Sequence, residues 1–277
     1  MRLGGPLFTP ADSPAAWAAA VRAHGYRAAF CPLQAGADES VVRAYTAAAA
    51  AADVVIAEVG AWSNPISPCP NERAAAIAYC QRQLDLAERV GARCCVNITG
   101  SRHPEQWDGP HPDNVSAATF DLVVESVRMI VDAVAPRRTC YTLETMPWAL
   151  PDSAESYLTL LEAIDRPCVA VHLDPVNLVN SPRLAYDTAR LIRHCCELLG
   201  PHIKSCHAKD IALAARLTTH LEEVRPGLGC LEYAVYLRCL DALGDVPLML
   251  EHLPNAGEYA AGADYIRGVA AREGITL

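Results

Sequence analysis

The sequence predicts an α/β fold, a single (β/α)8 TIM barrel that takes in residues 1–277 as one domain. Short β-rich runs alternate with runs of helical spacing along the whole chain, which is the rhythm of repeated βα units. Most of the short runs are apolar throughout, as expected for parallel strands that are buried on both faces. A doubly wound sheet is disfavoured because no glycine-rich phosphate loop follows the first strand.

The elements of this barrel can be placed in order. The eight expected strands are residues 2–8, 27–31, 54–59, 93–98, 139–144, 168–173, 203–207 and 248–251. Ser13-Pro14 opens the first helix and Ser181-Pro182 the sixth, each with serine as N-cap and proline at the first helical position. The remaining helices are expected to begin at Asp38 or Ser40, Asn71, Asn114 or Ser116, Asp152 or Ser153, and near Leu231 and Ala256.

Two connections are longer than the others. Residues 99–112 follow the fourth strand, and residues 211–229 follow the seventh. Both leave the carboxyl side of the barrel, where barrel enzymes build their active sites. Because long connections are often functional, we expect both to act as lids over a substrate.

The composition excludes several classes of partner. The net charge is −9 and no long basic run is present, so nucleic acid is a poor candidate partner. No apolar stretch is long enough to span a membrane, and the N-terminus lacks the apolar region of a signal peptide. We expect a soluble, cytoplasmic protein that acts on a small molecule. Most of the 12 cysteines lie in apolar runs without a CxxC pair, which favours reduced, buried thiols.

Four late strands end in residues that can bind a metal. These residues are Glu144, Asp174, His207 and Glu251. Adjacent parallel strands lie ~4.8 Å apart, so four neighbouring strand ends can surround one ion. Three carboxylates buried together without a cation would be very costly. The pattern predicts one divalent metal; oxygen-rich ligation favours Mn²⁺ or Mg²⁺, with Co²⁺ and Zn²⁺ as alternatives.

Other residues near these strand ends are candidates for substrate contact. Trp62 and Trp148 are expected to form apolar walls for the C–H faces of a sugar, or else to plug the barrel mouth. His172 should face the same side as Asp174 and orient it or contact substrate, unless it is a hydrogen-bonded core histidine. Arg225 could bind a hydroxyl, carboxylate or phosphate, or lie in a surface loop.

The residues that flank two of the expected ligands, His207 and Glu251, are expected to have supporting or structural roles. Lys209 and Asp210 are expected to lie just outside the ligand set and hold His207 in place, or to form a solvated charge pair. His252 follows Glu251 directly, so alternation along the strand predicts that its side chain points away, toward the helices.

Several runs resemble a known family. YTLETMPW, VHLDPVN, SCHAKD, RPGLG and LMLEH are similar to the xylose-isomerase-like barrel superfamily, and most to its sugar phosphate isomerase/epimerase group. That group includes ketose 3-epimerases, hydroxypyruvate isomerases and inosose dehydratases. The resemblance implies that Glu144, Asp174, His207 and Glu251 hold the metal and that the two glutamates form the acid/base pair. Homo-oligomers are common in the family, so the resemblance allows one here.

One position departs from the resemblance. Ketose 3-epimerases often carry Asp-x-x-His after the sixth strand, whereas this chain reads Asp174-Pro175-Val176-Asn177. Asn177 can hydrogen-bond a substrate hydroxyl but cannot act as a general acid or base near neutral pH. The metal site is untouched by this departure, and the identity as a 3-epimerase is weakened.

The expected function is a divalent-metal-dependent isomerase or epimerase of a sugar, sugar phosphate or related hydroxy-ketone. Proton abstraction next to a metal-bound carbonyl would be the chemical step. An inosose-type dehydratase on the same site is the first alternative. An endonuclease IV-like phosphoesterase and a non-catalytic sugar-binding barrel are further alternatives.

Overall fold

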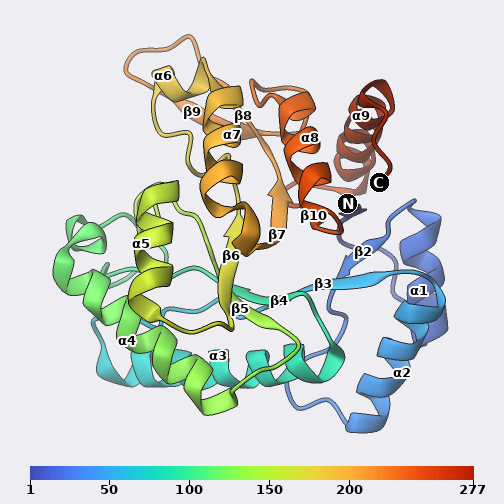
Figure 1. Cartoon of the computed structure of the whole chain (residues 1–277), viewed down its shortest axis with the longest axis horizontal. Helices are drawn as coiled ribbons and strands as arrows, with labels where there is room; N and C mark the ends of the chain where they lie inside the picture. Colours follow the sequence, from blue (N-terminus) through green and yellow to red (C-terminus); the bar gives the residue numbers. More distant parts are fainter.

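A computed structural model describes residues 1–277 and contains the predicted barrel (Figure 1). Eight parallel strands close on themselves in the order β1-β10-β7-β6-β5-β4-β3-β2. Their bounds are β1 Arg2–Gly4, β2 Ala28–Phe30, β3 Val55–Gly60, β4 Cys94–Asn97, β5 Cys140–Glu144, β6 Val169–Leu173, β7 Ile203–Ala208 and β10 Pro247–Leu250. The expected fold class is therefore confirmed.

The helices surround the strands, as Figure 1 shows. Ser13 and Ser181 cap the helices that follow them with their side-chain oxygens, and proline occupies the first helical turn at both places, as predicted. The helices are α1 Pro14–Ala23, α2 Glu39–Ala51, α3 Pro70–Val90, α4 Ala117–Val134, α5 Ala154–Ile164, α6 Pro182–Ala185, α7 Thr188–Leu199, α8 Tyr233–Leu243 and α9 Ala256–Glu273, with 3-10 turns η1 Pro112–Val115 and η2 Gly200–His202.

The first strand is shorter than its apolar run. Residues 2–8 were expected as a strand, but β1 ends at Gly4, and the chain then runs through Gly5 to Pro6. Pro6 has no N–H to give to a neighbouring strand. Gly4 itself is required by close approach, because a Cβ there would lie 2.5 Å from the carbonyl oxygen of Ala28.

Two strands that carry predicted site residues are joined by one tyrosine. The hydroxyl of Tyr157 on α5 accepts the backbone N–H of Leu143 at 3.0 Å and donates to the carbonyl of Ala170 at 3.0 Å. Both β5 and β6 are almost wholly buried. A buried tyrosine hydroxyl with such partners fixes the two strands relative to each other, just below their carboxyl ends.

The long connection after the seventh strand is an ordered hairpin. β8 Asp210–Leu213 and β9 Leu221–Val224 pair antiparallel, and α6 packs against β8. Part of the connection at residues 211–229 is therefore strand, and its role as a lid stays a prediction. The connection at residues 99–112 remains without helix or strand up to η1.

The structure bears on two predictions about the chain as a whole. None of its helices combines the length and the apolar character needed to cross a membrane. All twelve cysteines are free, and Cys69 is the exposed one among them.

Candidate metal centre and its cavity

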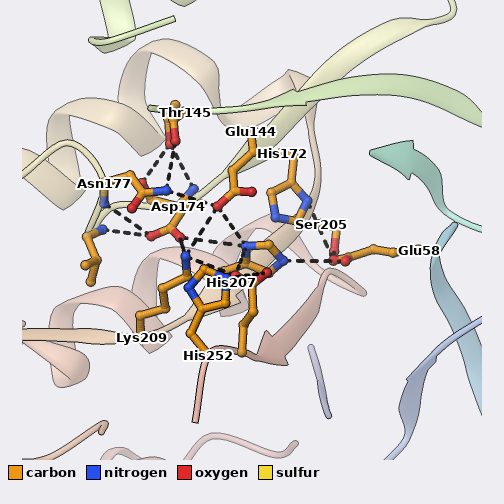
Figure 2. A network of polar contacts seen from close by, with 12 residues as sticks. Glu58, Glu144, Thr145, His172, Asp174, Asn177, Ser205, His207, Lys209 and His252 are labelled. Atoms are coloured by element: carbon orange, nitrogen blue, oxygen red, sulfur yellow. Dashed lines mark hydrogen bonds and ion pairs between the residues drawn. The ribbon is translucent and has the colours of Figure 1, made fainter. Parts of the chain in front are cut away.

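The four predicted metal-binding residues lie together at the carboxyl ends of neighbouring strands. Glu144 ends β5, Asp174 follows β6, His207 lies on β7 and Glu251 follows β10. One ligand atom from each lies within 4.8 Å of the others. The Nδ1 atom of His207 is 2.8 Å from Glu251 Oε2 and 3.1 Å from Glu144 Oε1. Figure 2 shows His207 between this acidic group and a second carboxylate, Glu58.

The ammonium group of Lys209 lies among the same carboxylates. Its Nζ atom is 2.9 Å from Asp174 Oδ2, 3.0 Å from Glu251 Oε2 and 3.5 Å from Glu144 Oε1. Residues two apart on a strand share a face, which places Lys209 on the same side of the chain as His207. Lys209 was expected just outside the ligand set; the structure places it in direct contact with three of its members.

The local charges shift the pKa values of these groups in opposite directions. Burial raises the pKa of the Glu144 carboxyl to about 7, against the lowering by His207 and Lys209. Burial also acts to raise the pKa of Asp174 and of Glu251. Burial is the largest single effect on both groups, but Lys209 and His207 together outweigh it for Asp174, and His207, Lys209 and His252 together outweigh it for Glu251, so both pKa values fall below the usual range. The carboxylates in turn raise the pKa of His207 and of Lys209, although burial opposes this.

Asn177 and Thr145 hold the acidic residues in place. The Nδ2 atom of Asn177 donates to Glu144 Oε1 and to the carbonyl of Thr145, both at 3.0 Å. The Thr145 hydroxyl donates to the carbonyl of Asp174 at 2.7 Å. Asp174 Oδ1 accepts the backbone N–H of Val176 at 3.0 Å. Asn177 therefore contacts Glu144 while also lining the cavity, where it was expected to meet substrate.

Glu58 is a buried residue of the centre for which the sequence suggested no role. It lies on β3, on the far side of the imidazole, with its Oε2 atom 3.5 Å from His207 Nε2. Its Oε1 atom accepts a short hydrogen bond from the Ser205 hydroxyl and is 3.6 Å from His172 Nδ1. The one sequence signal for a role of Glu58 was a charged residue inside an otherwise apolar strand. The signal did not identify the role, because the partners of Glu58 come from strands far away in the sequence.

His172 lies beside His207 inside the barrel. The two ring centroids are 4.1 Å apart, and His172 is completely buried. Burial, together with the charge of the neighbouring His207, lowers the pKa of His172 to about 4. His172 is absent from the lining of the cavity described below, so the structure places it next to Glu58 and His207 and away from the predicted substrate position.

A cavity of about 540 Å³ opens above the acidic group. Trp62 and Trp148, both predicted as walls, line it, and Trp107 from the long connection after β4 joins them. The indole of Trp148 donates to the carbonyl of Asp108 at 2.8 Å. Trp62 packs over Gly60, where a Cβ would lie 2.5 Å from the indole nitrogen. The two predicted tryptophans are therefore held in place by backbone contacts.

Two predicted residues are engaged away from the cavity. Arg225 donates to Glu258 Oε2 at 2.8 Å and does not line the cavity, so the structure does not bring it to the substrate position expected for it. Asp210 accepts the backbone N–H groups of Gly227 at 2.9 Å and Leu231 at 2.9 Å. Its carboxylate therefore anchors the chain that follows the hairpin instead of holding His207.

His252 lies elsewhere than the sequence predicted. Its side chain lines the cavity and lies 3.2 Å from Glu223 Oε1 on β9, so the prediction that it points away toward the helices is wrong. The strand has already ended at Leu250, and His252 adopts a positive φ of 57°. Strand alternation no longer applies there.

The donor set fits a divalent cation. Asp174 Oδ2 and Glu251 Oε2 are buried and lack an aligned hydrogen bond, although both lie within ion-pair distance of Lys209. His207 Nδ1 lies 3.1 Å from Glu144 Oε1 and 2.8 Å from Glu251 Oε2, so these three donor atoms are close enough together to bind one ion. Oxygen-rich ligation with one imidazole suits Mg²⁺ or Mn²⁺.

Comparison with known proteins places the chain in a family. Residues 18–269 match the family described as xylose isomerase-like TIM barrel, and the chain belongs to that family. The resemblance predicted from the sequence is thereby confirmed. No curated protein matches the chain in a sequence search.

Solved structures share the fold at low sequence identity. D-psicose 3-epimerase from Clostridium cellulolyticum, solved with D-tagatose, is 16% identical with a TM-score of 0.67, covering 97% of this chain and 99% of that one. The probable 3-DHS dehydratase AsbF from Bacillus anthracis is 18% identical with a TM-score of 0.67, covering 90% of each chain. Endonuclease IV from Thermus thermophilus is 16% identical with a TM-score of 0.72, covering 98% of this chain and 100% of that one. At these identities the likeness establishes the fold alone.

Proposed function

We propose that this chain is a divalent-metal-dependent isomerase or epimerase of a sugar or related hydroxy-ketone. The observation that carries the proposal is the convergence of Glu144, Asp174, His207 and Glu251 below the cavity, with one ligand atom of each within 4.8 Å of the others. These four residues would hold the cation. Mn²⁺ or Mg²⁺ is the preferred ion, and Co²⁺ or Zn²⁺ fits the same donors less well.

The two glutamates supply the proton chemistry. The cation would polarise a substrate carbonyl and make the adjacent C–H more acidic. Glu144 and Glu251 both lie at the cavity, next to His207 Nδ1, so one carboxylate takes the carbon-bound proton and the other group delivers a proton. Delivery to the opposite face of the same carbon gives epimerisation. Delivery to the neighbouring carbon gives aldose–ketose isomerisation.

The cavity favours this reaction over phosphoester hydrolysis. A site with several metal ions needs ligands from the early strands as well. Here Trp62 and Ile98 occupy the cavity just beyond the ends of β3 and β4, and neither residue type binds a metal. Glu58 on β3 is a carboxylate that could join His172 and His207 around an ion, but it is buried and does not line the cavity. No arginine lines the cavity, although phosphate groups are commonly held by arginine.

Metal content tests the proposal directly. We expect about one divalent metal ion per wild-type chain after purification without chelator, or after incubation with Mn²⁺, measured by mass spectrometry of the elements. Asp174→Asn should abolish this binding, because the amide loses the charge that attracts the ion.

Asp165→Asn is the matched control for that variant. Asp165 is exposed and has a positive φ of 51°, a conformation that asparagine adopts well, and it lies at the end of α5 away from the centre. It should bind the metal as the wild type does. Absence of any metal from the wild type in excess Mn²⁺ would overturn the proposal.

Glu58 is proposed to position His207 for the metal. With Nδ1 turned toward the cation, His207 keeps its proton on Nε2, which faces Glu58 Oε2 at 3.5 Å. Replacing Glu58 with glutamine should weaken metal affinity by about 10–100-fold, the usual effect of removing such a carboxylate. Isothermal titration with Mn²⁺ measures this change.

The matched control is Glu162→Gln, at an exposed position on α5. It should leave the affinity for Mn²⁺ unchanged. Equal affinities in Glu58→Gln and in the wild type would show that Glu58 has no part in holding the imidazole.

A further inference from the structure

The charges of the metal centre, with a divalent cation bound, balance without any charge from a substrate. Asp174, Glu144 and Glu251 contribute three carboxylates, and the Lys209 ammonium lies within 3.5 Å of each of them. With a divalent cation bound, these carboxylates are neutralised. His252 is paired with Glu223, at 3.2 Å. No cationic side chain at the cavity is left free to receive an anion.

Two arginines from the long connections after β4 and β7 are also engaged. Arg225 is paired with Glu258 at 2.8 Å, and Arg102 donates to the backbone carbonyl of Ile66. Neither lines the cavity, and the lining includes a further carboxylate, Asp108. A phosphate monoester would bring about −1.5 to −2 charges into this space at neutral pH. Such a charge would meet carboxylates and no donor suited to it.

The mouth of the cavity is aromatic. Trp62, Trp107 and Trp148 are 40%, 41% and 43% exposed, which is unusual for three large apolar side chains at one opening. Met146 and Pro147 lie among them. Flat indole faces suit the C–H faces of a sugar ring, since both are weakly polar and need no charge. Below this rim, Glu144 and Asn177 provide a polar floor.

We propose that the substrate is an uncharged carbohydrate with two parts. The reacting hydroxy-ketone end lies at the metal centre, and an uncharged ring, such as a second sugar, rests on the tryptophan rim formed by Trp62, Trp107 and Trp148. Sugar phosphates and sugar acids are excluded by the charge balance. This inference rests on the proposed function for the reacting end and adds to it the chemical class of the remainder.

Three ketoses that differ only at one carbon provide the test. D-Fructose, D-fructose 6-phosphate and isomaltulose share their reacting end and carry a hydroxyl, a phosphate or a glucosyl ring at carbon six. Calorimetric titration of the Mn²⁺-treated chain should rank isomaltulose about tenfold tighter than D-fructose, from ring stacking. The phosphate should bind about tenfold or more weakly than D-fructose, from charge repulsion.

Variants separate the effect of ring stacking on affinity from the effect of charge repulsion. Trp107→Leu and Trp148→Leu should each reduce the affinity for isomaltulose by a larger factor than the affinity for D-fructose. Tyr186→Leu, at an exposed aromatic residue outside the cavity lining, should change neither affinity. Glu223→Gln should improve binding of D-fructose 6-phosphate, whereas Glu222→Gln, the neighbouring change on β9, should not.

The outcomes are decisive in both directions. Binding of the phosphate as tight as that of D-fructose overturns the inference, and so does the absence of binding by both uncharged sugars. Choline serves as a cationic probe of the same rim, and tighter binding by choline than by the sugars also overturns it. Because calorimetry records binding without turnover, this test is distinct from the metal and proton-transfer tests of the proposed function.

Discussion

Replacing either glutamate of the centre with glutamine is expected to slow solvent deuterium incorporation into a ketose by about 10²–10⁴-fold, the usual contribution of a general acid or base. Glutamine keeps an oxygen that can face a cation but cannot accept or deliver the proton. Glu144 and Glu251 both line the cavity, so either loss interrupts the transfer. Proton nuclear magnetic resonance in deuterated water, with D-fructose, D-tagatose and isomaltulose as substrates, measures the exchange.

Two controls test whether a slower exchange comes from the loss of the acid/base groups. Glu222→Gln removes the same charge from β9 without touching the cavity lining and should retain the wild-type rate. Metal content of both variants should be determined in parallel, so that a lost rate is not mistaken for a lost ion. Wild-type rates of exchange in both Glu144→Gln and Glu251→Gln would remove the acid/base roles and favour a non-catalytic sugar-binding barrel.

The clustering of the four candidate metal ligands could be predicted from the sequence because it depends on strand order alone. Glu144, Asp174, His207 and Glu251 each come at the end of one apolar run, and successive parallel strands bring such ends together. The cavity walls were predictable for a related reason. Trp62 and Trp148 lie in the short stretches that follow the ends of β3 and β5, and large side chains at that place face the barrel mouth.

The other features of the candidate site depend on contacts between distant parts of the chain, which no local sequence pattern encodes. Glu223 reaches the cavity only because residues 210–224 fold back as a hairpin, and His252 turns inward only because its backbone leaves the strand conformation. Glu58 meets His207 across the barrel interior, between strands separated by most of the chain. Arg225 looked available in the sequence, but its partner Glu258 comes from α9.

The burial of Lys209 among three carboxylates could not be predicted from the sequence either. It leads to a second prediction with a large expected effect, on the stability of the fold. Lys209→Met, measured in chelator, is expected to destabilise the fold by about 3–5 kcal/mol, the usual cost of removing one partner from a buried ion pair. Lys209 is 2% exposed, and its ammonium lies within 3.5 Å of three carboxylates, which repel one another once it is gone. The melting temperature, followed by calorimetry, should fall by about 10 °C.

Added Mn²⁺ distinguishes this cause from simple loss of packing. The ammonium of Lys209 repels a cation bound to the same carboxylates, so Lys209→Met should bind Mn²⁺ more tightly than the wild type and recover most of its lost stability. Lys204→Met, on the same strand but only partly buried, should change neither property. If Lys209→Met melts at the wild-type temperature in chelator, the carboxylates are already neutralised by protons and the ammonium is not what holds them together. If Lys209→Met melts at a lower temperature in chelator and Mn²⁺ restores the wild-type melting temperature, then either the Lys209 ammonium or the metal ion can neutralise the buried carboxylates. The metal ion and Lys209 would then be held by the same set of carboxylates.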